Sequence, residues 1–167
     1  MKSIKEKYTL IIIDMQPDFQ ASKSRGLRGN IKNELRKAIQ NDCDVIFVEF
    51  DNHFSKTYSS LTKIVRNKNN VFFVSKEKIS GGQSIANVVN LNGLSKTFRI
   101  SGVQTECCVM STVTDLSKLF PGSKIEVIQN CCASFVSPLN HRVNDSAEDL
   151  HSKALAIMNK ITNVTVV

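Results

Sequence analysis

Short apolar runs that each end in a chemically capable residue constrain the fold of this chain more than any other feature. The clearest run is Leu10–Ile13, which is followed directly by Asp14. Runs without polar alternation are typical of strands in a parallel sheet that helices cover on both faces. Four predicted strands carry such residues at or beyond their ends: Tyr8–Ile13 (Asp14), Asp44–Phe50 (Asp51 and His53), Val71–Ser75 (Lys76) and Thr97–Val103 (Cys107 and Cys108). Because ligands bind at the carboxyl edge of parallel sheets, we expect these side chains to gather there.

Helical patterns alternate with the strands along the chain. We expect helices at Ile31–Gln40, Lys56–Arg66, Ser84–Val89, Glu106–Leu119 and Ala147–Lys160, and two further strands at Lys124–Gln129 and Val164–Val167. The last helix is the best marked, because Asp145 and Glu148 have the spacing of a capping box. The sequence predicts an α/β fold with a doubly wound, mostly parallel six-stranded sheet and helices on both faces, a Rossmann-like three-layer sandwich. Its length favours a single domain over residues 1–167.

The net charge of +7 raises the question of nucleic-acid binding. Lys and Arg are scattered, with their densest stretches at 2–7, 23–37 and 63–68, and aromatic residues are not interleaved with them as a base-stacking platform requires. We therefore expect a solvated basic surface and no nucleic-acid partner.

Neither a membrane-spanning segment nor a disulfide framework is expected from this sequence. No apolar window approaches the roughly 20 residues that span a bilayer, so we expect no membrane partner and a cytoplasmic location. The five cysteines form an odd set with two adjacent pairs, Cys107-Cys108 and Cys131-Cys132. This arrangement predicts reduced thiols rather than a disulfide framework.

Cys108 is the strongest candidate nucleophile. Thr105 is expected to cap the helix that follows, which would place Cys108 in the first turn, where free backbone N–H groups favour a thiolate and can donate to an oxyanion. The alternative is a small buried thiol. Asp14 and Lys76 also have alternative interpretations: Asp14 could cap a helix or loop, and Lys76 could be a surface lysine. Together they indicate a site, because a Lys beside an Asp would orient the carboxylate and favour the thiolate.

Several segments resemble the isochorismatase-like cysteine hydrolases, a superfamily that includes nicotinamidases and N-carbamoyl amidases. Residues 8–19 resemble the opening strand motif, Lys76 with Ser80 resembles the lysine segment, and residues 101–109 with Thr112 and Asp115 are similar to the segment that carries the nucleophile. Residues 127–130, followed by His151 with residues 154–155, resemble the two final blocks.

The resemblance implies specific roles for individual residues. It implies a catalytic triad of Asp14, Lys76 and Cys108, a non-proline cis peptide at Val103–Gln104, and an oxyanion hole made by the backbone N–H groups of Gln104 and Cys108. Relatives often carry an aromatic residue where Gly81 follows Ser80, and the chain has no Trp. An aromatic wall for the substrate is therefore expected from Phe19, with Phe54, Tyr58 and Phe135 as other candidates.

One departure concerns metal binding. Asp51 and His53 resemble the start of the nicotinamidase metal site, but no second histidine follows nearby. Two protein ligands are few for a stable site, so we expect no metal and no cofactor.

The sequence thus predicts a cysteine-dependent amidohydrolase that cleaves a C–N bond of a small amide or carbamoyl substrate through a thioester. The resemblance also implies a homo-oligomer. The alternative is a catalytically inactive family member that serves as a binding or interaction protein.

Overall fold

Six parallel strands form one sheet in the computed structural model, which describes residues 6–51, 54–137 and 145–167. The strands are β1 (Thr9–Ile13), β2 (Asp44–Phe50), β3 (Val71–Lys76), β4 (Thr97–Val103), β5 (Lys124–Ala133) and β6 (Val164–Val166). The helices are η1 (Gln20–Lys23), α1 (Arg25–Gln40), α2 (Ser59–Thr62), η2 (Lys63–Val65), α3 (Gly82–Asn92), η3 (Thr105–Val109), α4 (Met110–Leu119) and α5 (Ala147–Met158). The spatial order of the strands is β3-β2-β1-β4-β5-β6. The chain adds β2 and β3 on one side of β1 and then β4, β5 and β6 on the other, so the order of winding reverses between β1 and β4. This is the usual ligand-binding point of a doubly wound sheet.

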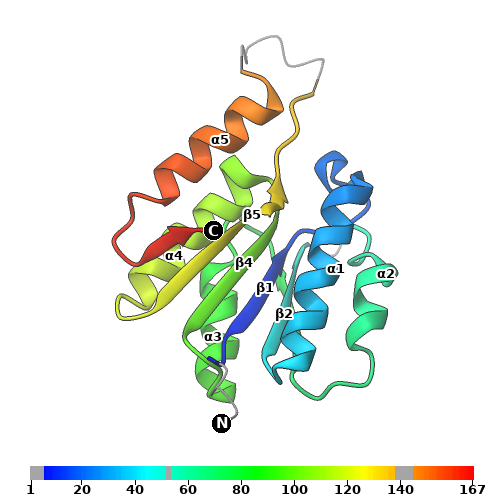
Figure 1. Ribbon diagram of the computed structural model, residues 1–167, viewed down its shortest axis with the longest axis vertical. Helices are drawn as coiled ribbons and strands as arrows, with labels where there is room; N and C mark the ends of the chain where they lie inside the picture. The colour runs from blue at the N-terminus through cyan, green and yellow to red at the C-terminus, as the bar shows by residue number, and fades with distance from the viewer. Residues whose placement is uncertain (1–5, 52–53, 138–144) are drawn as a thin grey trace.

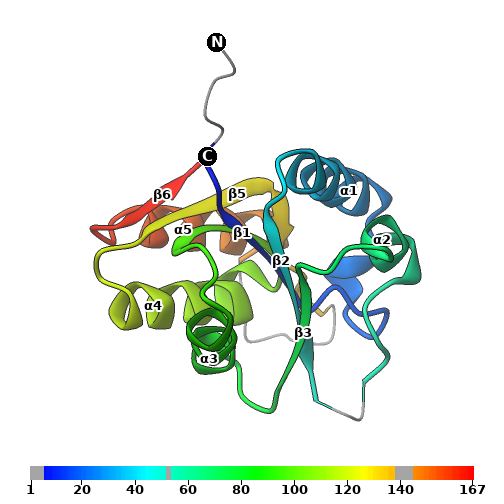
Figure 2. The ribbon, with the colours of Figure 1, turned by 90° about the horizontal axis from the view of Figure 1, so that it is seen from below.

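Alternating side chains of the central strands build two separate cores. Leu10 and Ile12 of β1 point to the face that packs against α1 and α2, whereas Ile11 and Ile13 point to the face that packs against α3, α4 and α5. Figure 1 and Figure 2 show these helices on opposite sides of the sheet. The predicted three-layer α/β fold is therefore confirmed.

The two faces are covered unequally. Among the described residues, three helices (α3, α4 and α5) cover one face, whereas α1 is the single long helix on the other. In Figure 1 the strands β4 and β5 lie beside α1, with no described helix across them. Polar residues of β4 and β5, including Arg99 and Glu126, lie on this open half.

The boundaries of several elements differ from those predicted. The helix α1 begins at Arg25, six residues before the predicted start, and Ser24 caps it by accepting a hydrogen bond from the Leu27 N–H. The segment predicted as one helix over Lys56–Arg66 contains only the four-residue α2 and the short η2.

The cap of α5 also differs from the prediction. Ser146 and Asp149 form the capping box, one residue after the predicted pair, while Asp145 forms an ion pair with Lys153 instead. Within the described ranges, none of the helices is both long enough and apolar enough to cross a bilayer.

Candidate active site

Asp14, Lys76 and Cys108 meet at the carboxyl edge of the sheet, where the strand order reverses. Asp14 follows β1, Lys76 ends β3, and Cys108 lies in η3, the turn of π-helix between β4 and α4. Gly102 allows β1 and β4 to approach closely here, since a Cβ atom at this position would lie 2.1 Å from the carbonyl oxygen of Ile13. Its φ of +129° is a second reason for glycine.

Asp14 and Lys76 form a fully buried ion pair. Lys76 Nζ lies 2.9 Å from Asp14 Oδ2, and the two side chains are 1% and 0% exposed. Asp14 also has a φ of +52°, which is uncommon for a residue other than glycine and is enriched at functional sites. A carboxylate in such a place is costly to bury without a partner, so Lys76 is what keeps it ionisable.

The Lys76 ammonium has an oxygen neighbour for each of its three N–H groups. Besides Asp14, it donates to the carbonyl oxygens of Ile79 at 2.9 Å and Lys78 at 3.2 Å. The ring of Phe50 lies below it, with the centroid 4.3 Å from Nζ, a favourable cation–π distance. These contacts fix the position of the cation.

Two hydrogen bonds connect the loop after β3 to α4, the helix that follows Cys108. Ser80 Oγ donates to Asp115 Oδ2 at 2.5 Å, and the backbone N–H of Gly81 donates to Thr112 Oγ1 at 2.9 Å. Three residues that resemble the family pattern, Ser80, Thr112 and Asp115, therefore help to connect the lysine loop to the helix that follows Cys108.

Cys108 is buried, and its surroundings disfavour the thiolate. Burial, the negative charge of Asp14 and the thiol's hydrogen bond to Asp14 raise its pKa to about 12, whereas Lys76 lowers it. These influences oppose the thiolate expected at a helix N-terminus, because removal from water and a nearby carboxylate act against the terminal N–H groups. The role of Cys108 as the nucleophile stays a prediction.

The carboxyl group of Asp14 is shifted in the direction that suits a base. Burial raises its pKa above the usual value, and Lys76 and the Cys108 thiol only partly offset this. Asp14 Oδ2 lies 2.9 Å from Lys76 Nζ, and the Cys108 thiol donates a hydrogen bond to the carboxylate. Each of the two neighbouring groups, Asp14 and Cys108, therefore affects the pKa of the other.

The turn that holds Cys108 begins with the cis peptide bond Val103–Gln104, as the resemblance implied. Gln104, and not Thr105, is the residue before the turn, and the Thr105 side chain does not cap it. Thr105 Oγ1 instead lies 2.9 Å from Nδ1 of His151 on α5. The backbone N–H of Gln104 has no hydrogen-bond partner among the described residues, so it is available to a ligand.

A group of aromatic rings stands beside the ion pair. The rings of Phe19 and Phe54 are stacked with centroids 5.3 Å apart, and both meet the ring of Phe50 edge-on. Phe50 was not predicted as a site residue, although its place at the end of β2 could have indicated it. The buried side-chain amide of Gln16 holds this region by binding the backbone of Phe50 and Ser55.

The candidate metal ligands are only partly described. Asp51 follows β2, but His53 lies outside the described residues. Within residues 6–51, 54–137 and 145–167, no three His, Cys, Asp or Glu side chains come together as a metal site. The expectation of a metal-free site stays a prediction.

Comparison with known proteins decides the family. The family model described as the Isochorismatase domain matches residues 8–166. The chain belongs to the isochorismatase family. It is accordingly a hydrolase of this type. A search of curated proteins found no match.

Solved structures share the fold of this isochorismatase-family chain at low identity. They include a nicotinamidase from Bacillus subtilis (21% identity, TM-score 0.74, covering 97% of this chain and 99% of that one). They also include an isochorismatase from Pseudomonas putida (15%, 0.78, 96% and 87%) and the MAR1 ribonuclease of Caenorhabditis elegans (16%, 0.76, 96% and 77%). The different activities in these names mean that the fold alone does not fix a substrate.

Proposed function

We propose that this protein is a cysteine-dependent hydrolase that cleaves a C–N bond of a small amide or carbamoyl compound. The observation that carries the proposal is the buried Asp14–Lys76 ion pair next to the buried thiol of Cys108. Family membership gives the hydrolase class, and a thiol nucleophile with a carboxylate base suits acyl transfer through a thioester.

In the first step, Asp14 takes the proton from the Cys108 thiol as Sγ attacks the carbonyl carbon. The raised pKa of both groups supports this assignment, because Asp14 is a stronger base than an ordinary Asp and the thiolate is a stronger nucleophile once formed. The C–N bond then breaks, and Asp14 gives its proton to the leaving nitrogen.

The second step consumes the thioester. Water attacks the carbonyl carbon and loses a proton to Asp14, the C–S bond breaks, and the proton returns to Cys108. Lys76 keeps Asp14 in place and offsets negative charge in both steps. We further propose that the N–H groups of Gln104 and Cys108 bind the oxyanion, which the free N–H of Gln104 supports.

The aromatic rings next to the ion pair suggest the shape of the substrate. Phe19 and Phe54 are half-buried and present flat apolar surfaces beside Phe50 and Lys76. We propose that Phe19 contacts a small, largely planar group attached to the scissile carbonyl. The proposed groups all lie at one edge of a single sheet, so we also propose that residues 1–167 form a single catalytic domain.

The direct test is ammonia release from a panel of primary amides and carbamoyl compounds, including nicotinamide, by the wild-type protein and Cys108→Ala. We expect release that Cys108→Ala abolishes, with Cys107→Ala as the matched control that retains it. Trapping a labelled acyl group on Cys108 by acid quench would identify the thioester. If no compound is hydrolysed and one still binds tightly at this site, the protein is a binding protein on the same fold.

A further inference from the structure

Almost all of the net positive charge belongs to one part of the chain. Residues 19–76 contain 11 Lys and Arg against 5 Asp and Glu, whereas the remainder contains 11 against 10. This stretch therefore holds +6 of the net +7. It comprises η1, α1, β2, α2, η2 and β3, which form one side of the molecule (Figure 2).

Most of the acidic residues in this stretch form ion pairs with Lys or Arg residues other than the ones considered below. Glu34 binds Lys37 and Arg99 on the open half of the sheet, Glu49 binds Lys56, and Asp42 binds Lys7. These acidic residues therefore do not neutralise the remaining cations of α1 and η2.

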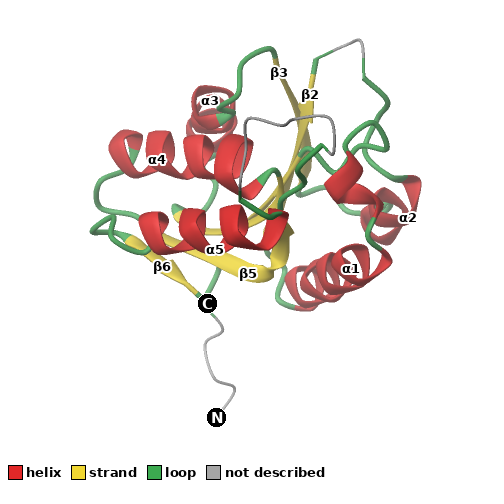
Figure 3. Ribbon diagram, turned by 90° about the horizontal axis from the view of Figure 1, so that it is seen from above, coloured by secondary structure: helices red, strands yellow, loops and turns green. Residues whose placement is uncertain are grey.

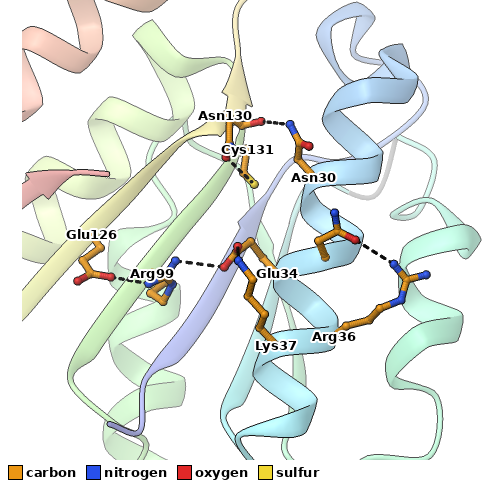
Figure 4. A network of polar contacts seen from close by, with 9 residues as sticks. Asn30, Glu34, Arg36, Lys37, Arg99, Glu126, Asn130 and Cys131 are labelled. Atoms are coloured by element: carbon orange, nitrogen blue, oxygen red, sulfur yellow. Dashed lines mark hydrogen bonds and ion pairs between the residues drawn. The ribbon is translucent and has the colours of Figure 1, made fainter. Parts of the chain in front are cut away.

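Three of these cations form a row on α1. Arg28, Lys32 and Arg36 follow one another at i, i+4 spacing and so share one side of the helix. The Arg28 guanidinium lies 4.6 Å from the ring centroid of Tyr58, the residue before α2, so the row runs along the side of α1 that faces α2 and η2. Figure 4 shows Arg36 on the side of α1 away from Glu34 and Arg99.

Three more cations follow on η2 and the loop after it. Lys63, Arg66 and Lys68 are exposed and line a surface groove of about 470 Å³ between η2 and the edge strand β3. No Asp or Glu occurs between Asp51 and Glu77. Figure 3 shows α2 beside α1.

We call Arg28, Lys32, Arg36, Lys63, Arg66 and Lys68 the α1–η2 basic surface. Within the described ranges, none of the six forms an ion pair with an acidic residue. The two stretches are 27 or more residues apart in the chain, but the contact between α1 and η2 brings them together in the fold.

An exposed aromatic ring stands in the same groove. Phe73 of β3 is 55% exposed, and its ring is stacked on the buried Phe47 with centroids 5.0 Å apart and planes 15° apart. The contact with Phe47 fixes the ring, so little side-chain freedom is lost when a second flat group stacks on it.

We propose that the α1–η2 basic surface and Phe73 bind single-stranded nucleic acid. Lys63, Arg66 and Lys68 share a groove with an aromatic ring on which a base can stack, and α1 adds three more cations beside η2. Surfaces that bind single strands combine these features. A second copy of this chain fits poorly, because it would bring two basic surfaces together, and an acidic peptide has no base to stack on Phe73. We expected no nucleic-acid partner from the sequence because α1, η2 and β3 become neighbours only after folding.

The test is fluorescence anisotropy of a labelled 15-nucleotide oligouridylate with the full chain at several salt concentrations. We expect log K to fall with log salt by about 0.7 for each phosphate contacted. The double variant Lys63→Gln/Arg66→Gln should bind about tenfold more weakly and lower that slope by about 1.4. The matched control Lys118→Gln/Lys160→Gln removes the same charge from exposed lysines elsewhere and should bind like the wild type.

Substitution of Phe73 separates a nucleic-acid site from a generic cationic surface. Phe73→Leu should weaken binding about tenfold with an unchanged salt slope, and Phe73→Tyr should restore it. Equal binding of all variants, an equal loss in the Lys118/Lys160 control, or tighter binding of polyglutamate than of the oligonucleotide would each overturn the proposal. Thermal unfolding and Cys108 labelling, measured on every variant, identify any loss caused by misfolding.

Discussion

Two groups of ion pairs lie at this sheet, and they differ in burial. Asp14 and Lys76 are fully buried, with side chains 0% and 1% exposed. In the second group, Arg99 bridges Glu34 and Glu126 on the open half of the sheet and is 24% exposed (Figure 4), and Lys124 adds a further ion pair with Glu126. A buried ion pair beside a thiol suits reaction, whereas partial hydration with several partners suits a structural contact.

The largest difference between the two groups should appear in catalysis. Asp14→Asn removes the proton acceptor and should lower turnover by about 10²–10⁴-fold with little change in the circular dichroism spectrum. Glu34→Gln, the matched change in the second group, should retain turnover. A fully active Asp14→Asn variant would show that another group transfers the proton.

The second largest difference between the two groups of ion pairs should appear in the free energy of unfolding. Lys76→Met leaves a buried carboxylate without its cation and should lower the free energy of unfolding by about 3–5 kcal/mol. The double variant Asp14→Asn/Lys76→Met should recover much of this loss, because no charge is then buried. Urea unfolding of the four proteins gives the coupling energy, and a coupling near zero would contradict the described ion pair.

The pH dependence should report the buried site. Asp14 must be ionised to accept a proton, and burial raises its pKa above 3.8, so turnover should fall with decreasing pH at a higher pH than for an ordinary Asp. Iodoacetamide should modify Cys108 slowly at neutral pH and faster toward its pKa of about 12. Because Asp14 also raises that pKa, Asp14→Asn should react faster at pH 8, and peptide mapping shows whether Cys108 is the residue modified.

A small effect is expected from the second group. Arg99→Met should cost about 1 kcal/mol or less, since its ion pairs are partly exposed and several partners keep their contacts with water. Urea unfolding at two salt concentrations measures this, and a loss as large as that of Lys76→Met would remove the distinction between the groups.

The smallest effect is expected from metal removal. The thiol, the carboxylate and the backbone N–H groups supply a nucleophile, a base and oxyanion donors, so turnover should survive dialysis against a strong chelator. Loss of turnover that one equivalent of Zn²⁺ restores would make Asp51 and His53 the first residues to test as ligands.

Much of the fold was predictable because strand burial leaves a strong sequence pattern. The runs ending at Asp14 and Lys76 gave both the parallel sheet and the residues at its edge. Helix starts were less predictable: Gly26 and Gly29 weaken the pattern at the start of α1, whose position depends on burial of Leu27 against the sheet. The raised pKa of Cys108 was not predictable either, because it depends on burial and on the proximity of Asp14.

Gly102 has a consequence for how this protein can change. Any side chain there would collide with the backbone of Ile13, and so would push the strand that carries Asp14 away from the one that leads to Cys108. A saturation library at position 102 should therefore return glycine alone under selection for activity, while positions 19 and 54 should accept several residues. Substrate preference can therefore change through substitutions at the aromatic rings, but the spacing between Asp14 and Cys108 requires glycine at position 102.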